Sequence, residues 1–332
     1  MKRNPSHEFA LLRPSRRPLK RLVGLIGSCA LLHSAVWAAS PQAEAVSEAV
    51  YHNPHIVFQK NLQPVSLQQR EPHTGFKSTE LRASLHSEVA YVQDLQSATV
   101  LYEKNSSEIR PIASITKLMT ALIVAEAGQD MDEMLEVTSA DIDRLKNSRS
   151  RLSVGTKLSR ADMLHLALMS SENRAANALG RHFPGGLPAF VRAMNDRARA
   201  LGMRQTHFVE PTGLSSENVS SPKDLVKLLQ ATAAQPLIQR YTTSEQYSIQ
   251  PSPGRQLMFN NTNRLVQNSK WDIQVSKTGF INEAGQCLVM LTKIDGRDVA
   301  IVLLNAQGRY SRIGDAVRLR SLVENNQQLA ML

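Results

Sequence analysis

The chain of 332 residues contains only two cysteines, Cys29 and Cys287. Two cysteines cannot form the dense disulfide framework of small secreted domains, so stability must come from a hydrophobic core. The sequence has no His-Glu-x-x-His pattern, which argues against a zinc peptidase, and no Gly-x-Ser-x-Gly turn, which argues against a Ser-His-Asp hydrolase. It also lacks any cofactor signature and any internal repeat of useful length.

Positive charge is plentiful but unevenly placed. The formal charge is +10, yet residues 1–38 hold seven lysines and arginines against one glutamate, so they carry +6 and the remaining residues +4. A basic stretch ending at Arg21 precedes the apolar run Leu22–Trp37, and the small residues Ala38 and Ala39 follow. This order predicts a signal peptide, residues 1–38, cleaved after Ala38. The excess charge therefore gives no indication of a nucleic-acid partner.

The leader also leaves alternatives open. Its apolar run is shorter than the roughly 20 residues of a membrane span, so a retained single-helix anchor is an alternative to cleavage. Ile26–Cys29 faintly resembles a lipobox, and Ser15–Arg17 resembles the start of a twin-arginine signal. Cleavage would leave Cys287, which lies in an apolar run and is expected to be a buried, unreactive thiol.

The rest of the chain divides into a spacer and a folded part. Residues 39–80 are rich in Gln, Pro, Ser, Ala and His without sustained periodicity, which predicts a flexible spacer. Residues 81–325 carry strand patterns first, then helical ones, then strands again. The predicted strands are 89–93, 99–102, 271–277, 286–293 and 299–305, and the predicted helices begin near 114, 161, 174, 187, 222 and 311. The first and last strands are expected to share one antiparallel sheet in an α+β fold.

Ser114 and Lys117 stand three residues apart at the start of the first helical pattern. On a helix this spacing places both side chains on one face, about 5–6 Å apart at Cβ. If burial or a second cation lowers the lysine pKa to about 7–8, the amine can accept the serine proton. The pair predicts a serine nucleophile with a lysine base, although Ser114 could simply cap the helix. A second copy at Ser220 and Lys223 is rejected, because a helix is expected to start after Ser220.

A second signal, Ser171-Glu-Asn173, lies at the junction of two helical patterns. The Ser171 hydroxyl can relay a proton to a leaving amine, and the Asn173 amide can orient the lysine and a substrate carbonyl. The simpler interpretation is that Ser171 caps a helix. A similar Ser216–Asn218 stretch lies among turn residues, where polar side chains satisfy the backbone.

The third signal, Lys277-Thr278-Gly279, ends a predicted strand and occurs once. A glycine on a strand often marks close approach of another backbone, here expected to be a substrate peptide added to the sheet edge. Lys277 and Thr278 would bind a terminal carboxylate, and Lys277 would help lower the pKa of Lys117. Phe280 would offer an N–H group to the oxyanion. The simpler interpretation is an edge strand with a solvated lysine.

In this order the three motifs resemble those of the serine penicillin-recognising enzymes, which include penicillin-binding proteins and class A β-lactamases. The surrounding residues resemble low-molecular-mass D-alanyl-D-alanine peptidases at 110–119, 210–214 and 260–265. The resemblance implies a β-lactamase/DD-peptidase-like fold, with an antiparallel sheet flanked by helices and an all-helical subdomain. It implies nucleophile, base, relay and organiser roles for Ser114, Lys117, Ser171 and Asn173, and substrate binding by Lys277, Thr278, Gly279 and Phe280.

Only residues 280–332 follow the third motif, which is short for the extra β domain and membrane tail of related carboxypeptidases. This form resembles the periplasmic D-alanyl-D-alanine endopeptidases, which cut D-alanyl–diaminopimelate cross-links. The resemblance implies peptidoglycan stem peptides as substrates, β-lactams as covalent inhibitors, a periplasmic location without a membrane anchor, and no metal or cofactor. Trimming of pentapeptide stems is the alternative. Glu172, where many relatives carry a small residue, leaves that preference open.

Two rival functions remain to be weighed. Class A β-lactamases use a glutamate in a Glu-x-x-Leu-Asn stretch to activate water, and no such stretch is present, so penicillins are expected to acylate Ser114 and leave slowly. A non-catalytic peptidoglycan-binding module would have no need of an activated serine.

Overall fold

The computed structural model describes residues 85–252 and 254–330, with side chains as far as residue 325. The described residues belong to one unit of the chain, Gln69–Leu332. The predicted signal peptide and spacer lie outside the described residues. Within the described part, no helix combines the length and the apolar character that a membrane crossing requires.

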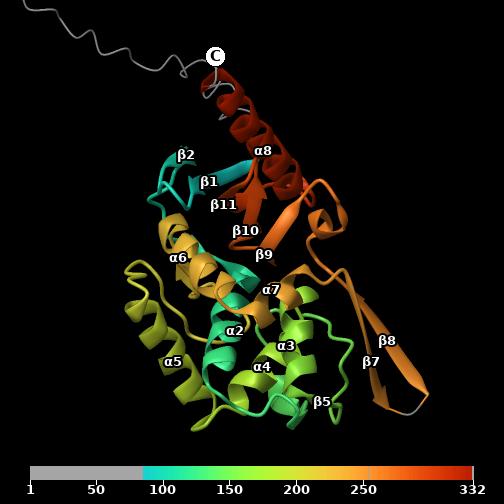
Figure 1. Ribbon diagram of the computed structural model, residues 1–332. Helices are drawn as coiled ribbons and strands as arrows, with labels where there is room; N and C mark the ends of the chain where they lie inside the picture. The colour runs from blue at the N-terminus through green and yellow to red at the C-terminus, as the bar shows by residue number, and fades with distance from the viewer. Residues whose placement is uncertain (1–84, 253, 331–332) are drawn as a thin grey trace, which may run out of the picture. The chain divides into compact units, whose positions relative to one another are not determined.

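The strands that open and close the described chain form a five-stranded antiparallel sheet in the order β2-β1-β11-β10-β9 (Figure 1). Its strands are β1 (Ser87–Asp94), β2 (Val100–Lys104), β9 (Asp272–Ile281), β10 (Gly285–Ile294) and β11 (Arg297–Ala306). The shared sheet is thus confirmed. β9, which carries the third motif, lies at its edge.

Both faces of this sheet are covered, which explains the nearly continuous apolar runs of its central strands. On β10, Leu288 and Met290 pack toward one face, and Val289 and Leu291 toward the other. Helix α8 (Ser311–Ala330) covers the first face, and α6 (Pro222–Ala233) lies against the second. The sheet therefore separates two hydrophobic cores, the larger of which continues into the helical part of the protein.

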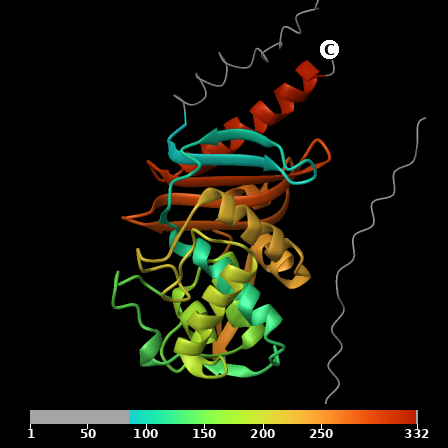
Figure 2. The same cartoon turned by 90° about the vertical axis from the view of Figure 1, so that its left-hand side faces the viewer.

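The helical part, below the sheet in Figure 2, is built around α2 (Thr116–Glu126). The residues of α2 from Thr116 to Val124 are all buried. The helices around it are α3 (Arg160–Met169), α4 (Asn173–Arg181), α5 (Gly186–Ala200), α6 and α7 (Pro236–Thr243). The predicted helices are confirmed, including the start of α6, where Ser221 caps the helix and Pro222 is its first residue. Strands followed by a helical insertion and a return to the sheet give the predicted α+β architecture.

Three short strand pairs and α7 were not predicted. The pairs are β3 (Arg110–Pro111) with β6 (Val219–Ser220), β4 (Met134–Glu136) with β5 (Lys157–Ser159), and β7 (Gln246–Ser252) with β8 (Arg255–Asn260). The β7–β8 hairpin extends away from the sheet (Figure 1) and buries only Ile249 and Phe259 fully. Such a strand pair leaves almost no apolar alternation in the sequence.

Candidate active site

Ser114 lies in a one-turn 3₁₀ helix, Ala113–Ile115, that leads directly into α2. Ala113 has a φ of +48°, a left-handed backbone that costs a residue with a Cβ about 1–3 kcal/mol and is concentrated at functional turns. Neither helix start has a side-chain cap bond. The Ser114 Oγ instead accepts a hydrogen bond from Lys117 Nζ at 2.9 Å. The predicted pairing is therefore present, and the capping interpretation is wrong.

Lys117 is fully buried and has three acceptors around its amine. Its Nζ lies 2.9 Å from Ser114 Oγ, 2.7 Å from Asn173 Oδ1 and 2.6 Å from the Thr212 carbonyl oxygen. Burial lowers the pKa of Lys117 to about 8, against the opposing effect of nearby carboxylates, Glu210 first among them. An amide oxygen and a carbonyl can only accept, so a neutral amine keeps its two hydrogens there and turns its lone pair toward Ser114.

Ser171 lies between α3 and α4 with a φ of +62°, a second strained position in the same region. The cap of α4 is Glu172, whose carboxylate accepts from the Arg174 N–H at 3.3 Å, so Ser171 is not the cap. Ser171 Oγ accepts a hydrogen bond from Lys277 Nζ at 2.9 Å. The strained turn thus directs the hydroxyl toward β9.

Lys277 is 1% exposed, so the interpretation as a solvated edge lysine is wrong. Its Nζ also donates to the Thr278 carbonyl at 2.9 Å. Burial, followed by the charges of Lys117 and Arg312, holds the pKa of Lys277 well below its ordinary value. The effect between the two lysines runs opposite to the prediction: the Lys117 charge lowers the pKa of Lys277, whereas burial is what lowers the pKa of Lys117.

The nucleophile turn and β9 are in direct contact at Gly279. A Cβ on Gly279 would lie 3.0 Å from the Ile112 carbonyl oxygen and 3.1 Å from the Ser114 nitrogen. The backbone whose close approach requires this glycine is the protein's own, not that of a substrate peptide as predicted. This contact brings the Ser114 N–H next to the backbone that continues into Phe280, whose side chain is exposed.

Gly213 fits even more closely against the same turn. It has a φ of +83°, and a Cβ there would lie 1.9 Å from the Ala113 carbonyl oxygen. The preceding residue supplies the Thr212 carbonyl that accepts from Lys117. The segment Glu210–Leu214 therefore forms one wall of the site, a role that sequence reasoning missed.

We expect Gly213→Ala to destabilise the protein by more than about 3 kcal/mol, because strain adds to backbone overlap. Gly155→Ala is a matched control, since Gly155 has a φ of +87° with nothing within 4 Å of the added Cβ. Its cost should be about 1 kcal/mol. Thermal unfolding of both variants measures the difference, and equal losses would show that the contact at Ala113 contributes nothing.

Glu210 organises this wall through its carboxylate. The carboxylate accepts from the backbone N–H groups of Thr212 at 2.6 Å and Gly213 at 2.7 Å, and from Asn218 Nδ2 at 2.9 Å. Asn218 Nδ2 also lies 3.1 Å from Thr116 Oγ1 in α2. The Ser216–Asn218 stretch thus supports the loop, as its turn-rich context predicted. The signal of this role in the sequence is the position of Glu210, directly before Pro211-Thr212-Gly213.

Glu172 likewise holds a neighbouring loop. Its Oε1 accepts from Ser150 Oγ at 2.5 Å, while Asn173 Nδ2 donates to Ser148 Oγ at 2.9 Å. The same loop reaches the β9–β10 turn through an ion pair between Lys146 and Glu283. The buried Glu172 charge also opposes the fall in the pKa of Lys117. The second motif therefore anchors the loop as well as the amine.

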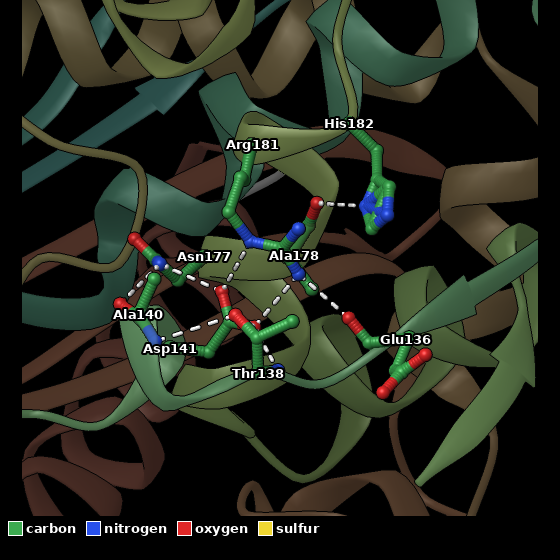
Figure 3. Close-up of polar contacts among 8 residues, drawn as sticks. All are labelled: Glu136, Thr138, Ala140, Asp141, Asn177, Ala178, Arg181 and His182. Carbon is green, nitrogen blue, oxygen red and sulfur yellow. Dashed lines mark hydrogen bonds and ion pairs between the residues drawn. The ribbon is translucent and has the colours of Figure 1, made fainter. Parts of the chain in front are cut away.

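Figure 3 shows the polar contacts that hold the C-terminal half of α4 in place. The Asp141 carboxylate receives hydrogen bonds from Asn177 at 2.8 Å and Arg181 at 2.9 Å, and Arg181 also donates to the Glu136 carbonyl at 2.6 Å. Burial raises the pKa of Asp141, but these hydrogen bonds and the Arg181 charge outweigh it, and the net shift of the pKa is downward. Asn173, Asn177 and Arg181 are spaced four residues apart, so they lie on one face of α4. The ion pair between Arg181 and Asp141 therefore fixes the orientation of the helix face that carries Asn173.

Other reactive groups lie apart from these contacts. Cys287 on β10 is fully buried, and burial raises the pKa of its thiol to about 11, which confirms the prediction of a buried, unreactive thiol. Among the described residues, no group of three or more His, Cys, Asp or Glu side chains is arranged to hold a metal ion.

Comparison with known proteins gives several matches. A family model described as D-alanyl-D-alanine carboxypeptidase matches residues 76–308. The chain is 47% identical over 252 residues to D-alanyl-D-alanine endopeptidases of Pseudomonas aeruginosa and Escherichia coli, covering 76% of this chain and 81% of each relative.

Solved structures agree with these matches. A DD-transpeptidase from Streptomyces is 26% identical with a TM-score of 0.67, and the match covers 72% of this chain and 97% of the transpeptidase chain. A penicillin-binding protein from Listeria monocytogenes, solved in its cefotaxime-bound form, is 29% identical with a TM-score of 0.64 and the same coverage. The match over residues 76–308 includes all three motifs. The chain therefore belongs to the D-alanyl-D-alanine carboxypeptidase family of serine peptidases.

Proposed function

We propose that this protein is a serine-type D-alanyl-D-alanine endopeptidase that hydrolyses D-alanyl–diaminopimelate cross-links through an acyl-enzyme on Ser114. The observation that carries the proposal is the pairing of two hydroxyls with two buried amines of lowered pKa, Ser114 with Lys117 and Ser171 with Lys277. Buried amines without carboxylate partners are costly to a fold, and they are kept where they serve chemistry. The 47% identical endopeptidases support the same assignment.

In the acylation step, neutral Lys117 accepts the Ser114 proton while Oγ attacks the carbonyl carbon of the D-alanine. The negative charge that develops on the carbonyl oxygen is stabilised by the N–H groups of Ser114 and Phe280. Asn173 holds the amine in place through its 2.7 Å contact. Lys117 is the base because its lone pair faces the nucleophile.

Collapse of the tetrahedral intermediate breaks the C–N bond, and the leaving amine needs a proton. Ser171 donates its hydroxyl proton to that nitrogen. It is then reprotonated by Lys117, which holds the proton taken from Ser114. Water then attacks the ester and gives a proton to the Lys117 amine. Lys117 passes this proton to Ser114 Oγ as the ester breaks, so the Ser114 hydroxyl is restored. The net result is that the Ser114 proton leaves with the product amine, and a proton from water restores the Ser114 hydroxyl.

The substrate is expected to lie along the edge of β9, whose neighbours in the sheet occupy only its other side. Lys277 and Thr278 would bind the carboxylate next to the leaving amine. The Lys277 amine has a depressed pKa, and an arriving carboxylate would favour its protonation, so binding and charge neutralisation are coupled.

The rate of acylation should depend on pH through Lys117. The base must be neutral, so the rate is expected to rise with pH and level off above about 8. The charges of Glu210, Glu172 and Asp143 hold this midpoint up, against the lowering effect of burial. Acylation by benzylpenicillin, measured from pH 5 to 10, tests this. A rate that falls through this range would contradict the assignment.

We also propose where the protein acts. The relatives are bacterial cell-wall peptidases, and the leader, residues 1–38, has the order of a cleavable export signal. A mature periplasmic protein with its catalytic domain at residues 81–325 follows, with peptidoglycan stem peptides as substrates and β-lactams as covalent inhibitors.

Digestion of purified muropeptides with identification of the products by mass is the decisive experiment. Release of monomers from cross-linked dimers is expected, and it should disappear in Ser114→Ala. Loss of only a terminal alanine from pentapeptides would instead make the protein a carboxypeptidase. No product from either substrate, with penicillin still bound, would indicate a binding module.

A further inference from the structure

A hollow of about 370 Å³ lies beside the end of β9, outside the hydrogen-bonded groups of the site. Its walls come from four segments: Thr262 and Arg264, Phe280 on β9, Gln286 on β10, and the residues from Arg309 to Arg312 that lead into α8. This volume falls in the range of about 300–1,000 Å³ that is usual for small-ligand sites. The hollow can therefore hold more than a single water or ion.

Three arginines line this hollow without any acidic side chain among its lining residues. Arg264 and Arg309 lie over the ring of Tyr310, at 4.8 Å and 5.4 Å from its centroid. In the described part of the chain neither has an ion pair, nor does Arg312. Arginines held against an aromatic ring keep their N–H groups available for carboxylates. We name this set, Arg264, Arg309 and Arg312, the arginine hollow.

The arginine hollow continues directly from the predicted carboxylate site. Thr262, in its wall, has its Oγ1 2.7 Å from Thr278 Oγ1. Arg312 Nη1 donates to the Gly279 carbonyl at 3.3 Å, while its Nε is buried without a hydrogen-bond partner. A peptide whose carboxylate is held at Thr278 can therefore extend into the arginine hollow, where its further carboxylates would meet positive charge.

We propose that the arginine hollow binds the leaving strand of a cross-linked substrate, through carboxylates beyond the one next to the scissile bond. This inference rests on the proposed endopeptidase function and identifies the part of the cross-linked substrate that the enzyme recognises. A carboxypeptidase releases a single alanine, which carries one carboxylate. An endopeptidase releases a whole stem peptide, which carries additional carboxylates farther from the bond. Only the second leaving group has further carboxylates for three arginines that form no ion pair with the residues that the structure describes.

The test compares Arg264→Gln, Arg309→Gln and the double variant with the wild type. Both side chains are exposed and do not touch the paired hydroxyls and amines. Arg204→Gln is the matched control, because Arg204 is exposed and lies outside the hollow. The substrates are a cross-linked muropeptide dimer, the same dimer with the leaving-strand carboxylates amidated, and a pentapeptide ending in D-alanyl-D-alanine.

We expect each single change to lower kcat/KM for the dimer about fivefold, mostly through KM, and the double change about twentyfold. Cleavage of the pentapeptide and acylation by benzylpenicillin should stay within about twofold, which also shows that the fold is intact. Amidation should cost the wild type about as much as the double change, and should cost the double variant little more.

Equal losses on the dimer and the pentapeptide, or an unchanged rate on the dimer, would overturn the inference. A separate binding measurement keeps it distinct from the proposed function: a free stem tetrapeptide should slow penicillin acylation of the wild type and not of the double variant. If the wild type trims pentapeptides but cuts no dimers, the endopeptidase function fails. If the tetrapeptide slows acylation of both proteins equally, the proposed role of the arginine hollow is wrong, whatever the rates of dimer cleavage are.

Discussion

Replacing Lys117 by alanine is expected to lower the rate of acylation of Ser114 about 10³-fold or more, because the variant has no base at the nucleophile. The amine is the group that contacts Ser114 Oγ, at 2.9 Å. Its loss leaves Asn173 Oδ1 and the Thr212 carbonyl without this donor, at a cost of about 1–3 kcal/mol for each acceptor if water does not replace it. Removing a costly buried amine offsets part of that loss, so the fold should persist.

Labelling by a fluorescent penicillin, together with thermal unfolding, measures both effects. Lys223→Ala is the matched control, since Lys223 stands at the same spacing from Ser220 but is exposed at the start of α6. This control should label like the wild type. A Lys117→Ala variant that labels at a near wild-type rate would mean that the base has been wrongly assigned.

Replacing Lys277 by alanine is expected to lower kcat/KM for carboxylate-bearing substrates about 10²-fold. Two contributions add: loss of the counter-charge for the carboxylate, and loss of the 2.9 Å contact that orients Ser171. An uncharged ester substrate depends only on the second contribution, so its loss should be clearly smaller. Benzylpenicillin and a neutral thioester are suitable substrates for the comparison.

The control for this change is Lys293→Ala on the neighbouring strand β10, an exposed lysine far along the strand from the motif. It should leave both substrates unaffected. Equal losses on the charged and uncharged substrates in Lys277→Ala would argue that the lysine positions Ser171 and binds no carboxylate.

Much of the fold could be predicted because its strands and helices carry strong patterns. β10 and β11 carry the apolar runs 287–291 and 299–304, which reflect burial on both faces, and the Asp295-Gly296 turn has the positive φ values, 50° and 78°, that its residue types predict. The β7–β8 hairpin and the two-residue strands could not be predicted. The hairpin buries few side chains, and the two-residue strands β3 and β6 pair with each other although they lie far apart in the sequence.

The site was predicted in its members but not in its supports. Glu210 and Gly213 act through backbone N–H groups and through a contact with Ala113, about one hundred residues earlier in the chain. A sequence pattern records residue types and spacing along the chain. It contains no record of which distant backbone a glycine must accommodate.

The sequence by itself determined the chemistry on offer: a serine and a lysine on one helical turn, a second hydroxyl at a helix junction, and a lysine at the end of a strand. These follow from local spacing, because three residues of helix fix the reach of Ser114 and Lys117. Only the tertiary structure decided that both amines are buried and that Lys277 reaches Ser171. Only it brought three arginines from two separate segments, Arg264 from one and Arg309 and Arg312 from the other, to one hollow. Burial and such meetings depend on how the sheet and helices pack, and packing is a property of the whole domain.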